Sequence, residues 1–181
     1  ELGRFNEAET SCRKALELKP NLSEAYNNLG IILQEFEKLD EADINFRKAI
    51  KIKPNFLEAY INLGNVLKEK GKIVDAINEY KKTLQILPNY KIAFYSIGNA
   101  LVGISFKKHL PDLEEVIYKI LEKKIHVRPK YISKTIVSLL KYNPKLVNAF
   151  KVYSEGNLKN TINETIAELS NIPLLLKLME V

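Results

Sequence analysis

Residues 57–90, LEAYINLGNVLKEKGKIVDAINEYKKTLQILPNY, decide the fold, because residues 23–56 are a near-copy of them. The prolines that close successive copies, Pro20, Pro54 and Pro88, stand 34 residues apart. The same spacing relates four further sets, one aromatic, one of Leu or Ile, one of Gly and one of Ala: Tyr26, Tyr60 and Phe94; Leu29, Leu63 and Ile97; Gly30, Gly64 and Gly98; Ala8, Ala42 and Ala76. A fixed period of this length indicates one supersecondary unit stacked on copies of itself.

Each unit has the pattern of two helices joined by a tight turn. Apolar residues recur at helical spacing in both halves of residues 57–90: Ala59, Tyr60, Leu63, Val66 and Leu67, then Ala76, Ile77, Tyr80, Leu84 and Leu87. Glycine favours the turn, which we place at Gly71-Lys72 in one copy and at Gly3-Arg4 in another. Proline then prevents the second helix from continuing.

These residues resemble the tetratricopeptide repeat family, whose pattern is aromatic, Leu-Gly, Ala, aromatic, Ala and Pro. The pattern occurs as Tyr26-Leu29-Gly30-Ala42-Phe46-Ala49-Pro54 and as Tyr60-Leu63-Gly64-Ala76-Tyr80-Thr83-Pro88, in part as Ala8-Cys12-Ala15-Pro20 and Phe94-Ile97-Gly98. Glu37 departs from it at the turn glycine, and Thr83 at an alanine. The resemblance implies an all-α, right-handed superhelix of about three repeats over residues 1–104: a partial repeat 1–22, repeats 23–56 and 57–90, and the start of another over 91–104.

After residue 104 the repeat signature fades, and we expect a divergent helical cap or connector over residues 105–181. Pro111 begins one predicted helix, and others are expected at about 130–142, 145–153, 158–170 and 173–180. The chain begins inside a repeat, so we expect a fragment of a longer protein with some exposed apolar surface over residues 7–18. It resembles bacterial repeat proteins that place such a connector before a transferase domain.

We expect the first helix of each repeat to line a concave groove. The groove residues are those of the first helices that lie beside the repeated core positions without occupying them: Asn27, Asn28, Ile31, Gln34, Ile61, Asn62, Asn65, Lys68, Tyr95, Ser96 and Asn99. An Asn amide both donates and accepts, so repeated amides can hold a peptide backbone. The Asn28 and Asn62 pair resembles the asparagine ladder of O-GlcNAc transferase, and Ser96 departs from it. The alternative is that these amides serve helix packing. Since Lys68 is the one inward cation, a clamp for a terminal carboxylate is disfavoured.

No catalytic constellation, metal site or cofactor motif is predicted, so the chain itself is not expected to be an enzyme. His109 and His126 are isolated in the sequence and have no second ligand at metal spacing. Cys12 occupies the position of Phe46 and Tyr80 and is expected in the core.

The charge of +6 is unevenly distributed. Residues 1–90 hold 14 basic and 14 acidic side chains, and residues 91–181 hold 14 and 8. No segment has the roughly 20 apolar residues of a membrane span, and we expect a cytoplasmic protein of undetermined oligomeric state. The leading hypothesis is a scaffold that binds an extended protein segment. The alternatives are the substrate-recruiting arm of a larger transferase, such as a glycosyltransferase or methyltransferase, and, less favoured, a nucleic-acid-binding module in the basic region 105–151.

Overall fold

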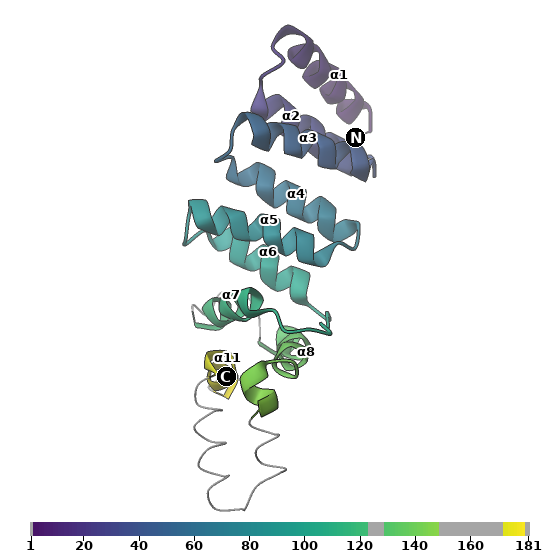
Figure 1. Ribbon diagram of the computed structural model, residues 1–181. Coiled ribbons are helices and arrows are strands. Elements are labelled where there is room, and N and C mark those ends of the chain that lie inside the picture. Colours follow the sequence, from purple (N-terminus) through teal and green to yellow (C-terminus); the bar gives the residue numbers. More distant parts are fainter. Residues whose placement is uncertain (1, 123–128, 149–171, 180–181) are drawn as a thin grey trace, which may run out of the picture. The chain divides into compact units, whose positions relative to one another are not determined.

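The computed structural model describes residues 2–122, 129–148 and 172–179, and these residues form helices and turns without a β-strand (Figure 1). The helices, in chain order, are α1 (Leu2–Leu18), α2 (Ser23–Glu35), α3 (Leu39–Ile52), α4 (Leu57–Glu69), α5 (Ile73–Ile86), α6 (Lys91–Leu101), α7 (Pro111–Glu122), α8 (Pro129–Leu140) and α11 (Pro173–Met179). The predicted all-α class is confirmed. No described helix is both long and apolar enough to cross a membrane.

The chain divides into two compact units, Glu1–Ala100 and Leu101–Val181. In the first unit, successive helices pack on each other from α1 to α5, and α2 also contacts α4. This neighbour-to-neighbour packing is that of a helical repeat array. The predicted domain limits at residues 104 and 105 remain a prediction.

The repeated core positions bring a glycine of each first helix against an aromatic ring of the second. Phe46 and Tyr80 are fully buried. A Cβ atom added to Gly30 would lie 2.7 Å from Cε1 of Phe46, and one added to Gly64 would lie closer still to Cε1 of Tyr80. Each glycine therefore makes room for a ring that fills the space between two helices.

The turns within the repeats are Schellman motifs, in which a left-handed residue ends the first helix. The amide of Lys72 donates to the carbonyl of Leu67, and Gly71 has a φ of 75°. Glu37 occupies the same place one repeat earlier and has a φ of 58°. This value lies in the left-handed region, which residues other than glycine rarely adopt. The predicted turn at Gly3-Arg4 is wrong, because both residues lie within α1, which continues through them as a regular helix.

In the second unit, α11 packs on α7 and α8, and α7 on α8. Ile117, Ile120, Ile132 and Ile136 form much of its core. Pro111 is the first residue of α7, as predicted. Asp112 and Glu114 lie in its first turn, where their carboxylates interact favourably with the positive end of the helix dipole. Residues 144–148 are helical, whereas the rest of the predicted helix 145–153 and the helix 158–170 lie outside the described residues.

Candidate functional site

The predicted binding residues that keep exposed surface lie on the first helices α2, α4 and α6. Asn28, Ile31, Tyr95 and Asn99 are exposed. Gln34, Asn62, Asn65, Lys68 and Ser96 are half-buried. We call these nine residues the first-helix face.

Two of the predicted groove residues are buried, so their assignment to an exposed surface needs correction. Asn27 is 6% exposed and Ile61 is 7% exposed, and they occupy the same position one repeat apart. At Asn27 the cause is the packing of α2 against α4, which turns this position toward the neighbouring helix. Tyr95, at the same position in α6, is 51% exposed.

Hydrogen bonds orient two of the amides on α4 in opposite senses. Asn62 donates from Nδ2 to Oδ1 of Asn27 over 3.0 Å, which leaves the Asn62 carbonyl oxygen as an acceptor. Asn65 accepts at Oδ1 from the Tyr80 hydroxyl over 2.8 Å, which leaves its Nδ2 group as a donor. One amide therefore offers an acceptor and the other a donor.

A second polar pair joins α2 to α4. Gln34 donates from Nε2 to Oε1 of Glu69 over 2.7 Å. Glu69 is not among the predicted groove residues, although the sequence held a signal for it: the Gln34–Glu69 and Asn27–Asn62 pairs are both separated by 35 residues. Polar pairs separated by 35 residues, one more than the length of the repeat, therefore indicate the contact between successive first helices.

The charge of α2 and α4 is mainly negative. They carry the carboxylates Glu24, Glu35, Glu58 and Glu69, and one cation, Lys68. Glu24 pairs with Lys53 over 3.0 Å. A hydrogen bond from Ser23, followed by the contact with Lys53, lowers the pKa of the Glu24 carboxyl to about 2. This charge balance is unsuited to an anionic ligand.

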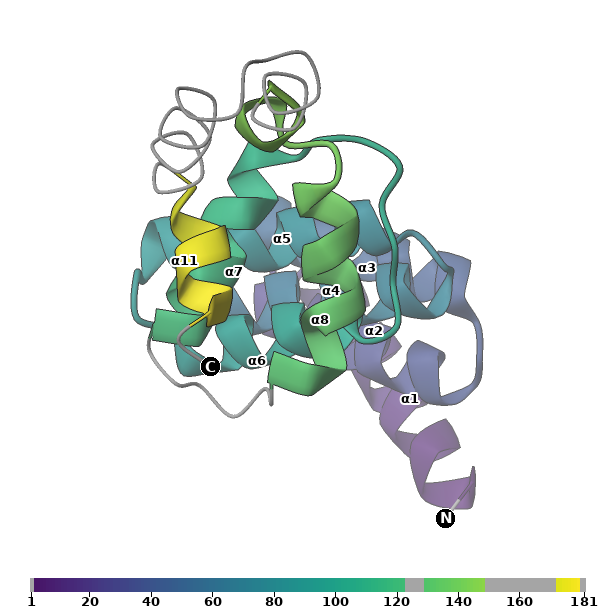
Figure 2. The same cartoon turned by 90° about the horizontal axis from the view of Figure 1, so that it is seen from below.

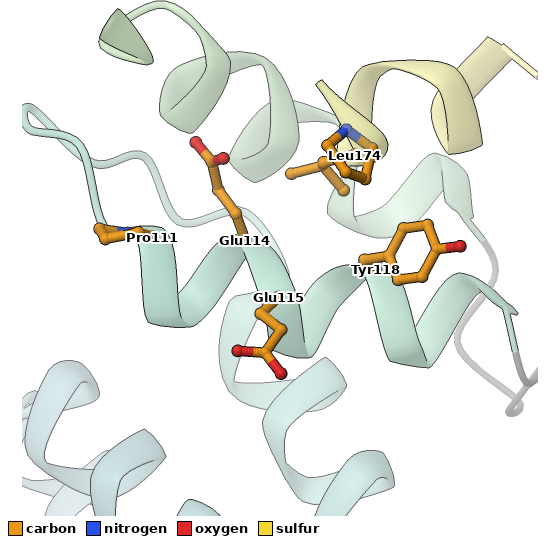
Figure 3. A pocket seen from close by; sticks show the side chains of 6 residues that line it. Pro111, Glu114, Glu115, Tyr118 and Leu174 are labelled. Carbon is orange, nitrogen blue, oxygen red and sulfur yellow. The ribbon is translucent and has the colours of Figure 1, made fainter. Parts of the chain in front are cut away.

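The second unit contains a cavity of about 400 Å³ between α7 and α11 (Figure 3). Its lining is mostly apolar, with two carboxylates: Pro111, Glu114, Glu115, Tyr118, Pro173 and Leu174. Glu115 is paired with Lys119 over 2.6 Å. The lining contains no nucleophile beside a general base, the arrangement that covalent catalysis requires.

The His109 imidazole, isolated in the sequence, lies beside a carboxylate in the fold, with its Nε2 3.3 Å from Oε1 of Glu114. They are five residues apart, and the start of α7 brings them together. Oε2 of Glu114 accepts from Nδ2 of Asn143 over 2.9 Å. Asn143 in turn accepts at Oδ1 from the amide of Lys145, so the cluster fixes the start of the next helix. Within the described residues no three His, Cys, Asp or Glu side chains could hold a metal ion, and His126 lies outside them.

Comparison with protein families identifies the repeats. A model described as tetratricopeptide repeat matches residues 11–43 and 45–78, and a second, described as TPR repeat, matches residues 64–104. Together they cover about half of the chain. No curated protein is similar enough to count as a match.

Solved structures share the fold at low sequence identity. MamA matches at 18% identity with a TM-score of 0.56, over 98% of this chain and 90% of MamA. A Thermobaculum terrenum O-GlcNAc transferase matches at 24% identity with a TM-score of 0.56, over 67% of this chain and 23% of the transferase. The first TPR of Spaghetti (RPAP3), bound to the HSP90 peptide SRMEEVD, matches at 19% identity with a TM-score of 0.52, over 54% of this chain and 78% of that one.

Proposed function

Because the chain belongs to the tetratricopeptide repeat family, we propose that it is a non-catalytic scaffold that binds an extended protein segment on its first-helix face. The observation that carries this proposal is the opposite orientation of the Asn62 and Asn65 amides. Stacked repeats present extended binding surfaces, and the first-helix face spans three successive first helices.

The two oriented amides suit a peptide backbone, in which each residue offers one N–H donor and one C=O acceptor. Residues three apart on a helix have Cβ atoms about 5–6 Å apart, close to the roughly 6.6 Å between alternate residues of an extended chain. Asn62 would accept from a peptide N–H, and Asn65 would donate to a peptide C=O. Asn28 and Asn99, which are exposed, would extend these contacts along the segment.

The remaining residues of the face indicate which segments bind best. Ile31 and Tyr95 are exposed and offer apolar contacts for alternate side chains of the segment. The carboxylates of α2 and α4 outnumber Lys68, so a segment with basic side chains is favoured and an acidic one is disfavoured. We therefore expect a basic, partly apolar segment.

The test starts from peptides selected for binding to the full chain from a random display library. The Kd of a selected peptide is then measured by fluorescence anisotropy with Asn28→Ala and Asn99→Ala, because neither side chain makes a hydrogen bond within the described residues. We expect a loss of about 1 kcal/mol per lost backbone contact, or about fivefold in Kd. Unchanged affinity in both variants would contradict the proposal.

Two controls separate binding from stability. Asn78→Ala changes an exposed Asn on α5, outside the first-helix face, and is expected to leave the Kd unchanged. The peptide SRMEEVD is expected to bind weakly because of its carboxylates. Asn65→Ala is a less clean test, because it would also leave the buried Tyr80 hydroxyl without its acceptor and lower stability.

The likeness to the O-GlcNAc transferase supports a second candidate, in which the same face recruits substrates for a transferase. The chain spans 23% of that protein's length. This proposal requires a catalytic region in the same reading frame, and sequencing the flanking frame tests it directly. A full-length reading frame without a catalytic region would contradict this second candidate and would be consistent with the scaffold proposal.

A further inference from the structure

The two complete repeats differ at one surface site, where the end of the second helix meets the start of the first. The helix pairs of these repeats, α2 with α3 and α4 with α5, follow one another along the array (Figures 1 and 2). In the earlier repeat, the Nζ of Lys53 lies 3.0 Å from Oε1 of Glu24 and 4.6 Å from the centre of the Phe56 ring. That site therefore consists of a carboxylate, a cation and an aromatic ring.

The later repeat keeps the carboxylate and the ring but not the cation. The counterparts of the carboxylate and the ring, 34 residues on, are Glu58 and Tyr90, whereas Leu87 stands in the place of Lys53. Glu58 is exposed, and its side chain makes neither an ion pair nor a hydrogen bond among the described residues. Burial and then the negative charge of Glu58 raise the pKa of the Tyr90 hydroxyl, so the two side chains lie near each other.

We propose that Glu58, Leu87 and Tyr90 form a binding site for a basic side chain, preferably arginine, of the segment bound to the first-helix face. We call these three residues the cation site. This inference rests on the proposed function and adds to it the place where a basic residue is recognised. The segment supplies the cation that Lys53 supplies in the earlier repeat.

The three residues of the cation site suit an arginine side chain. The Glu58 carboxylate can accept two hydrogen bonds from one guanidinium group. The face of the Tyr90 ring attracts the same cation, and a guanidinium group also stacks on it. Leu87 is 46% exposed and can cover the aliphatic stem, since long basic side chains pack their stems along apolar surface. A lysine also fits, but its point charge neither stacks nor pairs in two places, so we expect it to bind more weakly.

The cation site adjoins the amides that are proposed to hold the peptide backbone. Glu58 and Asn62 are four residues apart on α4, so their Cβ atoms lie about 5–6 Å apart on one side of the helix. A segment whose N–H group donates to Asn62 can therefore place a neighbouring basic side chain on Glu58. On α2, Glu24 has the same relation to Asn28, but Lys53 already occupies that carboxylate. We therefore expect one preferred position for the basic residue, over α4.

The test uses peptides selected from a random display library for binding to the full chain, with the Kd measured by fluorescence anisotropy. Glu58→Gln removes the charge and keeps the shape, and we expect it to weaken binding about three- to fivefold. Leu87→Lys should weaken binding about tenfold, because an internal cation then occupies the site and repels that of the segment. Glu24→Gln is the matched control and should leave the Kd unchanged, because Lys53 fills that site.

The peptide provides the second half of the test. Each arginine of a selected peptide is replaced in turn by citrulline, which is neutral and similar in shape. At one arginine the Kd should rise about three- to fivefold with the wild-type chain. With Glu58→Gln the same replacement should change the Kd less than about twofold, because the partner charge is already absent. Equal effects in both chains at every arginine would overturn the inference.

The outcomes separate this inference from the proposed function. If no peptide is selected, both fail. If peptides bind and respond to Asn28→Ala, but carry no basic residue or ignore both Glu58→Gln and Leu87→Lys, the inference fails alone. Thermal denaturation tests whether the chain itself supplies a cation to Glu58. In that case Glu58→Gln would lower the melting temperature as Glu24→Gln does and leave the Kd unchanged, which would also contradict the inference.

Discussion

In residues 1–100 a glycine meets an aromatic ring twice at the same spacing, whereas in the second unit a single buried hydroxyl on α8 meets two carbonyl groups at and after the end of α6. Gly30 faces Phe46 and Gly64 faces Tyr80. In the second unit, the fully buried Thr135 hydroxyl lies 2.6 Å from the Leu101 carbonyl oxygen and 2.7 Å from that of Ile104. One hydroxyl hydrogen is thus shared between two carbonyl groups.

The difference shows how two kinds of packing appear in a sequence. The contacts between glycine and ring recur because the two helices of each repeat pack in the same way. Their 34-residue period is therefore visible in the sequence. The contacts of Thr135 occur once and depend on the path of the chain after α6. Such contacts stabilise a unit without leaving a pattern.

The largest effect is expected where a ring blocks the added methyl group. Gly64→Ala should lower the free energy of unfolding by about 3 kcal/mol, because the Tyr80 ring is buried and is also held by its bond to Asn65. Gly30→Ala should cost about 1–2 kcal/mol, since the Phe46 ring makes no such bond. Urea denaturation followed by circular dichroism measures both. Equal costs would show that the bond to Asn65 does not hold the ring.

A smaller loss is expected at the polar contact of the second unit. Thr135→Val keeps the shape of the side chain but removes the hydroxyl, and it should cost about 2 kcal/mol because the Ile104 carbonyl loses its donor. Thr135→Ser retains the hydroxyl and serves as the matched control. Thermal denaturation of both variants measures the loss of stability. A Val variant as stable as wild type would show that the polar contact is dispensable.

A modest gain is expected at the turn that departs from the repeat pattern. Glu37→Gly should raise the stability of the repeat array by about 0.5–1 kcal/mol, because a left-handed φ carries a penalty for residues with a Cβ. At the equivalent turn of the next repeat, Gly71→Ala adds a Cβ instead of removing one, and it should lower the free energy of unfolding by about 1 kcal/mol. Chemical denaturation of the pair makes the comparison, and a loss of stability in Glu37→Gly would mean that the Glu37 side chain is required.

The smallest effect is expected for the exposed pair of Glu24 and Lys53. Because the folded pKa of Glu24 is lowered to about 2 from 4.5, its stabilising contribution is present above pH 4.5 and is lost as the pH falls toward 2. The melting temperatures of wild type and Glu24→Gln should therefore differ slightly at pH 6 and converge near pH 2. A difference that grows on acidification would contradict the lowered pKa.

Much of the repeat fold follows from residues whose spacing is visible. Pro54, Pro88 and the buried Leu29 and Leu63 identify the helix pairs, because a stacked unit must bury the same positions each time. The candidate face was harder to predict. Asn27 and Asn28 are adjacent in the sequence, yet one is buried and the other exposed, since the contact of α2 with α4 depends on how one repeat rotates against the next.

That this protein is a helical repeat array follows from its residue order alone, because helix periodicity, small residues at helix contacts and prolines act locally and recur in register. What each polar group on that array does depends on the partners that folding brings to it. The Asn62 and Asn65 amides acquire opposite orientations from Asn27 and Tyr80, which are partners on other helices.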